Sequence, residues 1–252
     1  MRQKSSLIII GNEILSGRTM DKNGNYIAEQ MTRHGVPLAE IRVVPDVEEK
    51  IIEALDALRD EYDYVFTTGG IGPTHDDITA ATVAKALGTE FERHEEAYQV
   101  LLDYYGPEEL TEARATMADM PRGVTLIPNP VSGAPGFQIE NIFVLAGVPR
   151  IMQAMLNHVI TQIAPGDPIL SNTIGCNLQE SIMAEGLAVV QEKYDTVDIG
   201  SYPSFRGGQL TVSVVLRGTD KTSVSAATKD VIELVAERGG EVQTESFQAV
   251  VD

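Results

Sequence analysis

The chain has 252 residues, enough for one large domain or two modest ones, and its 43% hydrophobic and 22% charged residues are ordinary for a globular protein. Its net charge of −18 argues against nucleic acid and against an anionic membrane surface as partners, because both require basic patches. The single cysteine, Cys176, excludes an intramolecular disulfide and a thiolate zinc cluster.

The N-terminus contains an apolar run that is too short for a signal peptide and that enters a strand directly. No stretch of the sequence approaches the roughly 18 apolar residues of a membrane span. We therefore expect a cytoplasmic protein.

Short apolar strands alternate with amphipathic helices in the first part of the chain. We expect strands at residues 6–11, 37–44 and 64–68, and helices at residues 23–34, 46–60 and 78–87. Asp46, with Glu49 three residues later, predicts a capping box at the second helix, and Gly88 is a typical residue for the end of the third. This order predicts a parallel sheet covered on both faces, with ligands bound beyond the carboxyl ends of its strands.

The middle of the chain is more irregular. Residues 91–119 predict an acidic helical pair broken at Gly106, whose face is either solvated or an oligomer contact. A strand at 125–127, a turn rich in proline and glycine at 128–137, two short strands at 138–141 and 142–146 and a helix at 149–163 follow.

Residues 164–168 form the best candidate for a linker. Beyond it we expect a strand at 169–174, a helix at 179–193, strands at 197–202 and 210–217, a helix at 221–238 and a strand near 242. This β-α-β-β-α-β order fits a ferredoxin-like domain. The predicted fold class is therefore a three-layer α/β/α sandwich with a mostly parallel sheet over residues 1–165, followed by a small ferredoxin-like α+β domain over residues 166–252.

A glycine-rich loop directly follows the third strand and contains Gly69, Gly70 and Gly72. Glycines allow positive φ and close approach of a ligand, and a loop before a helix offers unpaired amides to a phosphate. The hydroxyls of Thr68 and Thr74 are further candidate donors. The alternative is a tight turn that binds no ligand.

Carboxylates cluster in the same loop and in the loop after the first strand. Asp76 and Asp77 would repel a phosphate unless a divalent cation lay between them, so we expect Mg²⁺, Co²⁺ or Mn²⁺ there. We expect Glu13, Asp76 and Asp77 as metal ligands, and Asp21, Asp76 and Asp77 as catalytic residues. Two other interpretations stay open. Asp77 can instead cap the following helix, and Glu13 can instead form an ion pair with Arg18.

A second group of small and turn-forming residues can line the opposite wall of such a pocket, although a purely structural turn explains them equally well. These residues are Ser132, Gly133, Pro135, Gly136, Gly147 and Pro149. In the last third of the chain, Arg206 is a candidate clamp for a ligand phosphate, with a plain hairpin as the alternative.

Four separated motifs together resemble a known family. They read GNEILSG-x3-D-x-N from residue 11, TTGGIGPTHDDIT from residue 67, SGAPGF from residue 132 and LAGVPRIM from residue 145. They are similar to motifs of the molybdopterin-binding (molybdenum cofactor biosynthesis) domain family, most closely the branch found at the N-terminus of CinA and in eukaryotic FAD synthases. The SYPSF and LTV segments also resemble the small domain that follows in this branch.

The resemblance implies a pocket that, in the molybdenum cofactor enzymes, binds molybdopterin and supports its adenylylation with Mg²⁺ and ATP. Asp21 and Asp77 match the acidic pair of that family. Ile71 and Asp76 depart from it, because a threonine and a basic residue are usual there. These departures favour the CinA branch, which is associated with metal-dependent hydrolysis of the pyrophosphate in ADP-ribose or FAD.

The resemblance therefore predicts a homo-oligomer, dimer or trimer, that binds a phosphorylated pterin or dinucleotide, with molybdopterin itself as one candidate ligand. We expect it to be a metal-dependent nucleotide pyrophosphatase. The alternatives are a molybdopterin adenylyltransferase and a sensor that binds the ligand without turnover.

Overall fold

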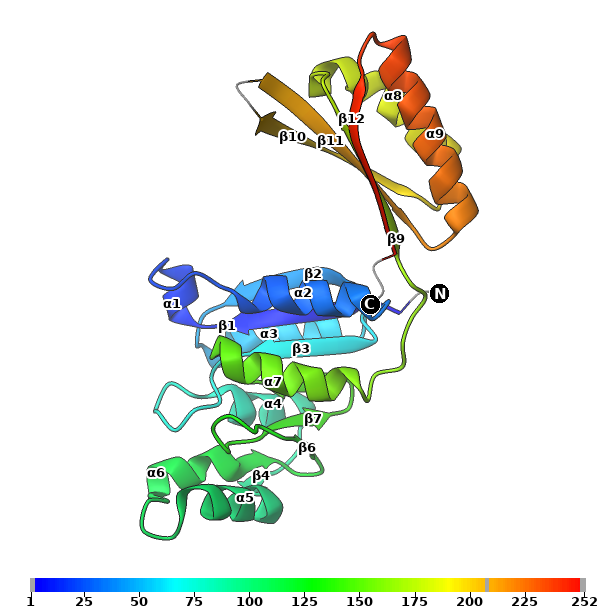
Figure 1. Cartoon of the computed structure of the whole chain (residues 1–252). Coiled ribbons are helices and arrows are strands. Elements are labelled where there is room, and N and C mark those ends of the chain that lie inside the picture. Colours follow the sequence, from blue (N-terminus) through cyan, green and yellow to red (C-terminus); the bar gives the residue numbers. More distant parts are fainter. Residues whose placement is uncertain (1–2, 207–208, 250–252) are drawn as a thin grey trace. The chain divides into compact units, whose positions relative to one another are not determined.

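The computed structural model describes residues 3–206 and 209–249 and divides the chain into two compact units, Met1–Gly166 and Asp167–Asp252. Figure 1 shows an α/β unit and a smaller unit with an antiparallel sheet, which confirms the predicted fold class. In the described part of the chain, no helix is long and apolar enough to cross a membrane.

The first unit is built on a six-stranded sheet in the order β2-β1-β3-β8-β7-β6. Its strands are β1 (Ser5–Ile10), β2 (Leu38–Val44), β3 (Tyr64–Thr68), β6 (Thr125–Ile127), β7 (Gly136–Ile139) and β8 (Ile142–Leu145). Strands β2, β1, β3 and β8 are parallel, whereas β7 is antiparallel to both of its neighbours. The carboxyl ends of four parallel strands therefore share one edge of the sheet.

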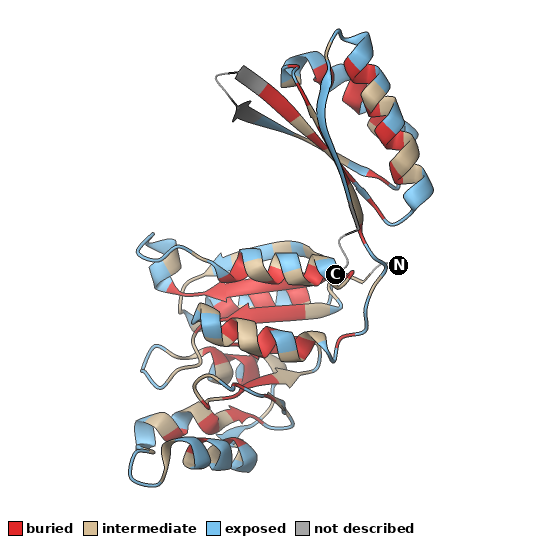
Figure 2. Ribbon diagram, in the orientation of Figure 1, coloured by how far each residue is buried: buried red, intermediate tan, exposed pale blue. Residues whose placement is uncertain are grey.

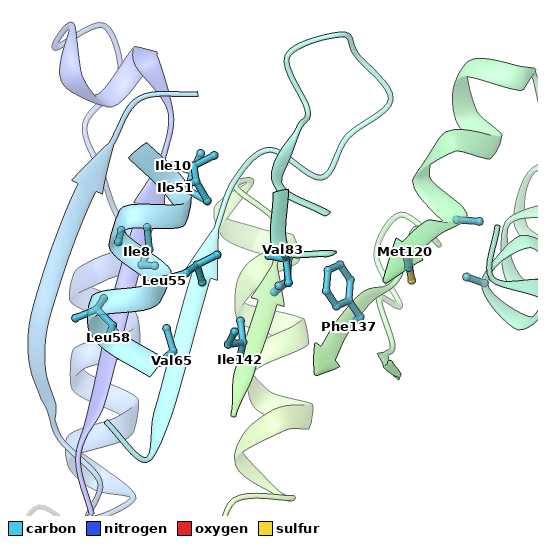
Figure 3. Packing of buried hydrophobic residues seen from close by; sticks show 14 of the residues in the cluster. Ile8, Ile10, Ile51, Leu55, Leu58, Val65, Val83, Met120, Phe137 and Ile142 are labelled. Carbon is cyan, nitrogen blue, oxygen red and sulfur yellow. The ribbon is translucent and has the colours of Figure 1, made fainter. Parts of the chain in front are cut away.

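Helices cover both faces of this sheet. Along β1, Leu7 and Ile9 pack against α2 (Asn23–Arg33) and α7 (Pro149–Ile160), because alternate side chains of a strand point to opposite faces. Ile8 and Ile10 pack on the other side, in a cluster with α3 (Glu48–Arg59), α4 (Thr79–Leu87) and α5 (Glu95–Tyr105), as Figure 3 shows for part of it. Burial on both faces explains why β1 reads as an unbroken apolar run.

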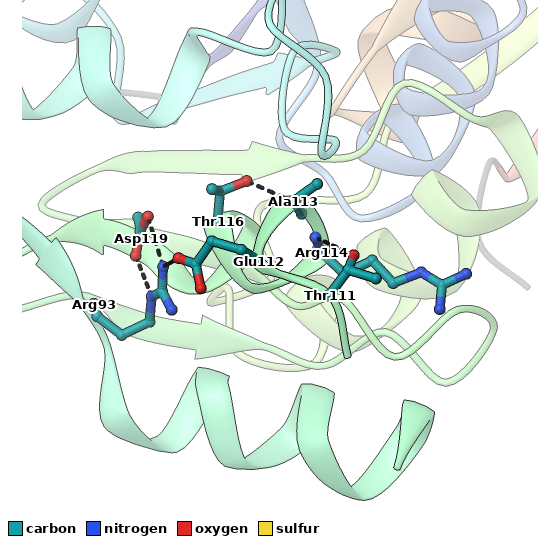
Figure 4. Close-up of polar contacts among 7 residues, drawn as sticks. All are labelled: Arg93, Thr111, Glu112, Ala113, Arg114, Thr116 and Asp119. Atoms are coloured by element: carbon teal, nitrogen blue, oxygen red, sulfur yellow. Dashed lines mark hydrogen bonds and ion pairs between the residues drawn. The ribbon is translucent and has the colours of Figure 1, made fainter. Parts of the chain in front are cut away.

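The segment predicted as an acidic helical pair contains two strands that the sequence analysis missed. Between α4 and β6 lie β4 (Phe91–Arg93), α5, α6 (Glu112–Ala115), the 3-10 helix η1 (Thr116–Ala118) and β5 (Asp119–Pro121), with β4 and β5 paired as an antiparallel ribbon. Arg93 of β4 forms ion pairs with Asp119 of β5, at 2.5 Å, and with Glu112 of α6, at 3.0 Å (Figure 4). Each strand has three residues, too few to show a period of two.

The capping box predicted at α3 is wrong. Val47 is the N-cap of α3 and makes no side-chain bond there. The carboxylate of Asp46 instead accepts a hydrogen bond from the backbone N–H of Asn12, at 2.8 Å. Asn12 opens a short helix, α1 (Asn12–Leu15), within the segment predicted as a loop. Asp46 therefore ties together the two loops that follow β1 and β2.

The second unit has the predicted β-α-β-β-α-β order. Its elements are β9 (Leu170–Cys176), α8 (Glu180–Lys193), β10 (Asp198–Arg206), β11 (Gln209–Gly218), α9 (Lys221–Glu237) and β12 (Val242–Ala249). The antiparallel sheet has the order β10-β11-β9-β12, and α8 and α9 pack on it around Met183, Val214 and Val231. Figure 2 shows the buried residues of each unit, among which Cys176 is fully enclosed.

Candidate functional site

A cavity of about 640 Å³ opens at the carboxyl edge of the first unit's sheet. Its volume lies within the range of roughly 300–1,000 Å³ that is usual for small-molecule sites. The segments that follow β1, β2, β3, β6 and β8 line it, together with residues of α5, α6, α7 and η1. The polar and charged side chains of the lining are Glu13, Thr19, Asp46, Thr74, Asp76, Asp77, Tyr105, Arg114, Asn129 and Ser132.

The glycine-rich loop forms one wall of this cavity. Gly69 and Gly70 have φ of 103° and 67°, backbone angles that residues with a side chain rarely adopt. Thr79, at the start of α4, holds this loop through its hydroxyl, which donates to Gly69 O at 2.9 Å, and through its N–H, which donates to Gly70 O at 2.9 Å. The N–H of Gly69 donates a hydrogen bond to Leu145 O at 3.2 Å. The N–H groups of Gly70 and Gly72 donate to no acceptor within the described residues. These two amides are therefore candidate donors to an anion.

The two adjacent aspartates converge on one hydroxyl in the same loop. Thr74 Oγ1 lies 2.6 Å from a carboxylate oxygen of Asp76 and 2.5 Å from one of Asp77, which also accepts from Thr74 N at 2.8 Å. The hydrogen bond from the Thr74 hydroxyl is the largest cause that lowers the pKa of Asp76 below its usual value. Asp77 does not cap α4, whose N-cap, Ile78, makes no side-chain bond.

A divalent metal would find two hard oxygen donors in this pair. Mg²⁺ is commonly held by one or two carboxylates, with waters and substrate phosphates completing its shell. Asp76 and Asp77 fit such a site in number and in donor type. No group of three His, Cys, Asp or Glu side chains that could hold a metal occurs among the described residues, so the structure does not bring Glu13, the third predicted ligand, into such a group with Asp76 and Asp77.

Comparison with known proteins places the chain in a family. Residues 6–166 match the model described as "Probable molybdopterin binding domain", and residues 168–240 match the one described as "FAD synthase, middle domain". The chain belongs to the molybdopterin-binding domain family. This confirms the family that the four motifs predicted.

Relatives of similar length occur among archaeal proteins. A protein of Pyrococcus abyssi is 35% identical over 251 residues, which cover 94% of this chain and 97% of the relative. One of Caldivirga maquilingensis is 33% identical over 93% of this chain and 96% of its own. The solved structure of CinA from Thermoplasma acidophilum, a protein of unknown function, is 34% identical, covers 64% of this chain and 98% of its own, and superposes with a TM-score of 0.61. This likeness agrees with the CinA-like branch of the molybdopterin-binding family.

Most of the residues predicted from the sequence lie at the cavity. The predicted residues that line it are Glu13, Gly69, Gly70, Gly72, Thr74, Asp76, Asp77, Ser132, Gly147 and Pro149. Pro135 lines a neighbouring cavity of about 370 Å³, which shares Thr74 and Asp77 with the first. Their roles in binding and catalysis stay predictions.

Other predicted residues do not line the cavity. Asp21 accepts hydrogen bonds from the N–H groups of Asn23 and Gly24, at 3.1 and 2.9 Å, and so binds the first turn of α2. Thr68 is buried in β3, with a hydroxyl that has no partner among the described residues. Gly133 and Gly136 lie against Tyr104 and Val144, where a side chain would collide. The Arg206 side chain lies outside the described residues.

Several residues that shape the site were not singled out from the sequence. Asn129 accepts from the N–H groups of Val131 and Ser132, at 3.0 and 3.1 Å, and donates to Ser132 Oγ at 2.7 Å. An asparagine flanked by prolines is a turn signal that marks it. Tyr105 and Arg114 come from the segment predicted to be solvated or an oligomer contact, and nothing in their local pattern points to a ligand.

Proposed function

We propose that this protein binds a phosphorylated dinucleotide or pterin in the 640 Å³ cavity and hydrolyses a pyrophosphate bond, of the kind in ADP-ribose or FAD, with a divalent metal. One observation carries the proposal: the amides of Gly70 and Gly72 and the carboxylates of Asp76 and Asp77 lie in one loop at the cavity. Amides favour phosphate oxygens, whereas carboxylates repel them unless a cation intervenes.

The residues of the site have different roles in the proposed reaction. The N–H groups of Gly70 and Gly72 would bind phosphate oxygens, and the Asp76–Asp77 pair would hold a divalent metal. A bound divalent metal polarises the phosphoryl oxygen and lowers the pKa of a coordinated water. Hydrolysis adds the oxygen of one water to one phosphorus, the bridging oxygen leaves with the other, and two monophosphates result. From ADP-ribose these products are AMP and ribose 5-phosphate.

An assay of AMP release tests the proposal. ADP-ribose or FAD is incubated with the full chain and Mg²⁺, Mn²⁺ or Co²⁺, with EDTA as the metal-free control. We expect metal-dependent release of AMP, reduced about 100-fold or more in Asp77→Asn, because a lost metal ligand removes several kcal/mol of charge stabilisation. Asp103→Asn changes the charge equally on the exposed surface of α5, and should retain the activity.

The same incubations separate the alternatives. Equal activity in Asp77→Asn and Asp103→Asn would refute the assigned role of Asp77. Adenylylated pterin formed from ATP and molybdopterin would indicate adenylyl transfer, and tight binding of all these ligands without any product would indicate a sensor. Light scattering in the same buffer measures the subunit number, for which a dimer or trimer stays the prediction.

A further inference from the structure

The charged lining of the 640 Å³ cavity is strongly unbalanced. Four carboxylates line it, those of Glu13, Asp46, Asp76 and Asp77, whereas Arg114 is the one cationic side chain among the described residues that do so. The chain as a whole has a net charge of −18. A ligand with two or more phosphate charges is therefore repelled by most of its surroundings, and one divalent metal offsets part of this repulsion.

Arg114 is held in a defined position at the cavity. It lies in α6, whose N-cap Thr111 accepts a hydrogen bond from the N–H of Arg114 at 3.3 Å (Figure 4). Its guanidinium carbon lies 4.6 Å from the centre of the Tyr105 ring. Its Nη1 donates to the backbone oxygen of Glu109, at 2.5 Å, and to the carboxylate of Glu109, at 3.0 Å. These contacts orient the group before any ligand arrives.

Part of the guanidinium is left without a partner. Hydrogen bonds within the described residues use Nη1 alone, so Nε and Nη2 have donors to spare, and 36% of the side chain is exposed. By contrast, Arg93 is occupied by Asp119 and Glu112, and Arg122 by Glu90 and Glu92. Guanidinium groups bind phosphate oxygens through such paired donors.

We propose that Arg114 binds a phosphate group of the ligand and thereby selects nucleotides over the corresponding nucleosides. The inference rests on the proposed function and names one further binding residue for it. Tyr105 and Glu109 act on the ligand through Arg114, by holding its guanidinium plane in place. The segment between β4 and β5 is then part of the binding site.

Calorimetric titration with α,β-methylene-ADP, which cannot be hydrolysed at its methylene bridge, tests the inference in the presence of Mg²⁺. We expect Arg114→Met to raise the Kd about tenfold or more, which corresponds to the loss of a hydrogen bond to a charged group. Arg122→Met changes the charge equally but lies outside the cavity lining, and should bind as the wild-type protein does. Arg114→Lys, which keeps the charge but not the planar fork, should be intermediate.

Adenosine serves as the control ligand, because it lacks phosphate: its binding should be the same in all four proteins. Melting curves of each variant establish that it is folded. If the wild-type protein binds α,β-methylene-ADP and Arg114→Met binds it equally well, or loses no more affinity than Arg122→Met, the inference about Arg114 is refuted while the proposed function stands. If the wild-type protein neither binds the nucleotide nor hydrolyses ADP-ribose or FAD, the proposed function fails.

Discussion

At the scale of single residues, two glycines of the first unit show different reasons for being glycine. Both Gly69 and Gly88 have positive φ, of 103° and 65°. A side chain added at Gly69 would place its Cβ 2.2 Å from the backbone oxygen of Ile10, whereas nothing lies within 4 Å of the equivalent position at Gly88. Gly88 is required by backbone conformation alone, but Gly69 is required also by the contact between β3 and β1.

Alanine substitution at both positions separates these two causes. We expect Gly88→Ala to lower the free energy of unfolding by about 1–2 kcal/mol, because of the left-handed backbone. Gly69→Ala should cost about 2–5 kcal/mol, since overpacking adds about 1–3 kcal/mol more where backbone atoms cannot yield. Urea unfolding followed by circular dichroism measures both. Equal losses of stability in the two variants would show that β1 moves away from residue 69 at little cost in free energy.

At the scale of elements, the loops around the site are fixed by hydrogen bonds between segments far apart in sequence. Asn23, in the first turn of α2, is 5% exposed and donates from Nδ2 to the backbone oxygen of Gly147 at 2.7 Å. Gly147 lies between β8 and α7, where its Cα lies against the glycine loop: a Cβ there would be 3.2 Å from Gly69 Cα. The hydrogen bond from Asn23 therefore holds Gly147, a residue of the cavity lining, in place.

The substitution Asn23→Ala should lower the free energy of unfolding by about 0.5–1.5 kcal/mol, because it removes the hydrogen bond that the buried Asn23 side chain donates to the Gly147 oxygen. A matched control comes from the same pair of helices. Asn157 of α7 accepts from the Tyr26 hydroxyl of α2 at 3.3 Å, but at an exposed position. Asn157→Ala should therefore change the stability by less than about 0.5 kcal/mol. Urea denaturation of both variants checks the difference, and a similar loss in both would contradict the role given to burial.

The elements also show what the sequence makes visible. The strands and helices with long periodic patterns were predicted close to their observed bounds, and the glycines and aspartates of the site are contiguous in the chain. Contacts between residues far apart in the chain could not be predicted from the sequence. Asp46 matched a local capping pattern, but its partner is Asn12, 34 residues away. Arg114 reaches the cavity because the ribbon of β4 and β5 folds its segment back, and three-residue strands leave no period to detect.

At the scale of the whole molecule, the two units have separate hydrophobic cores. Each core cluster of buried residues lies within one unit, and the cavity-lining residues that the structure describes all belong to Met1–Gly166. The end of this unit is fastened to it: Gly166 N donates to the backbone oxygen of His34 at 2.9 Å, and His34 Nε2 lies 2.8 Å from the backbone oxygen of Ile163. The first unit therefore contains the elements that a stable fold and a complete cavity require.

A shortened protein of residues 1–168, which keeps the contacts of Gly166, tests this independence. We expect it to fold and to bind α,β-methylene-ADP with a Kd within about twofold of that of the full chain, because the truncation removes none of the described residues that line the cavity. Calorimetric titration and a melting curve of each protein measure the two properties. A folded 1–168 protein whose affinity fell tenfold or more would show that residues beyond 168 contribute to binding. An unchanged Kd would leave the small unit with a role other than holding the nucleotide.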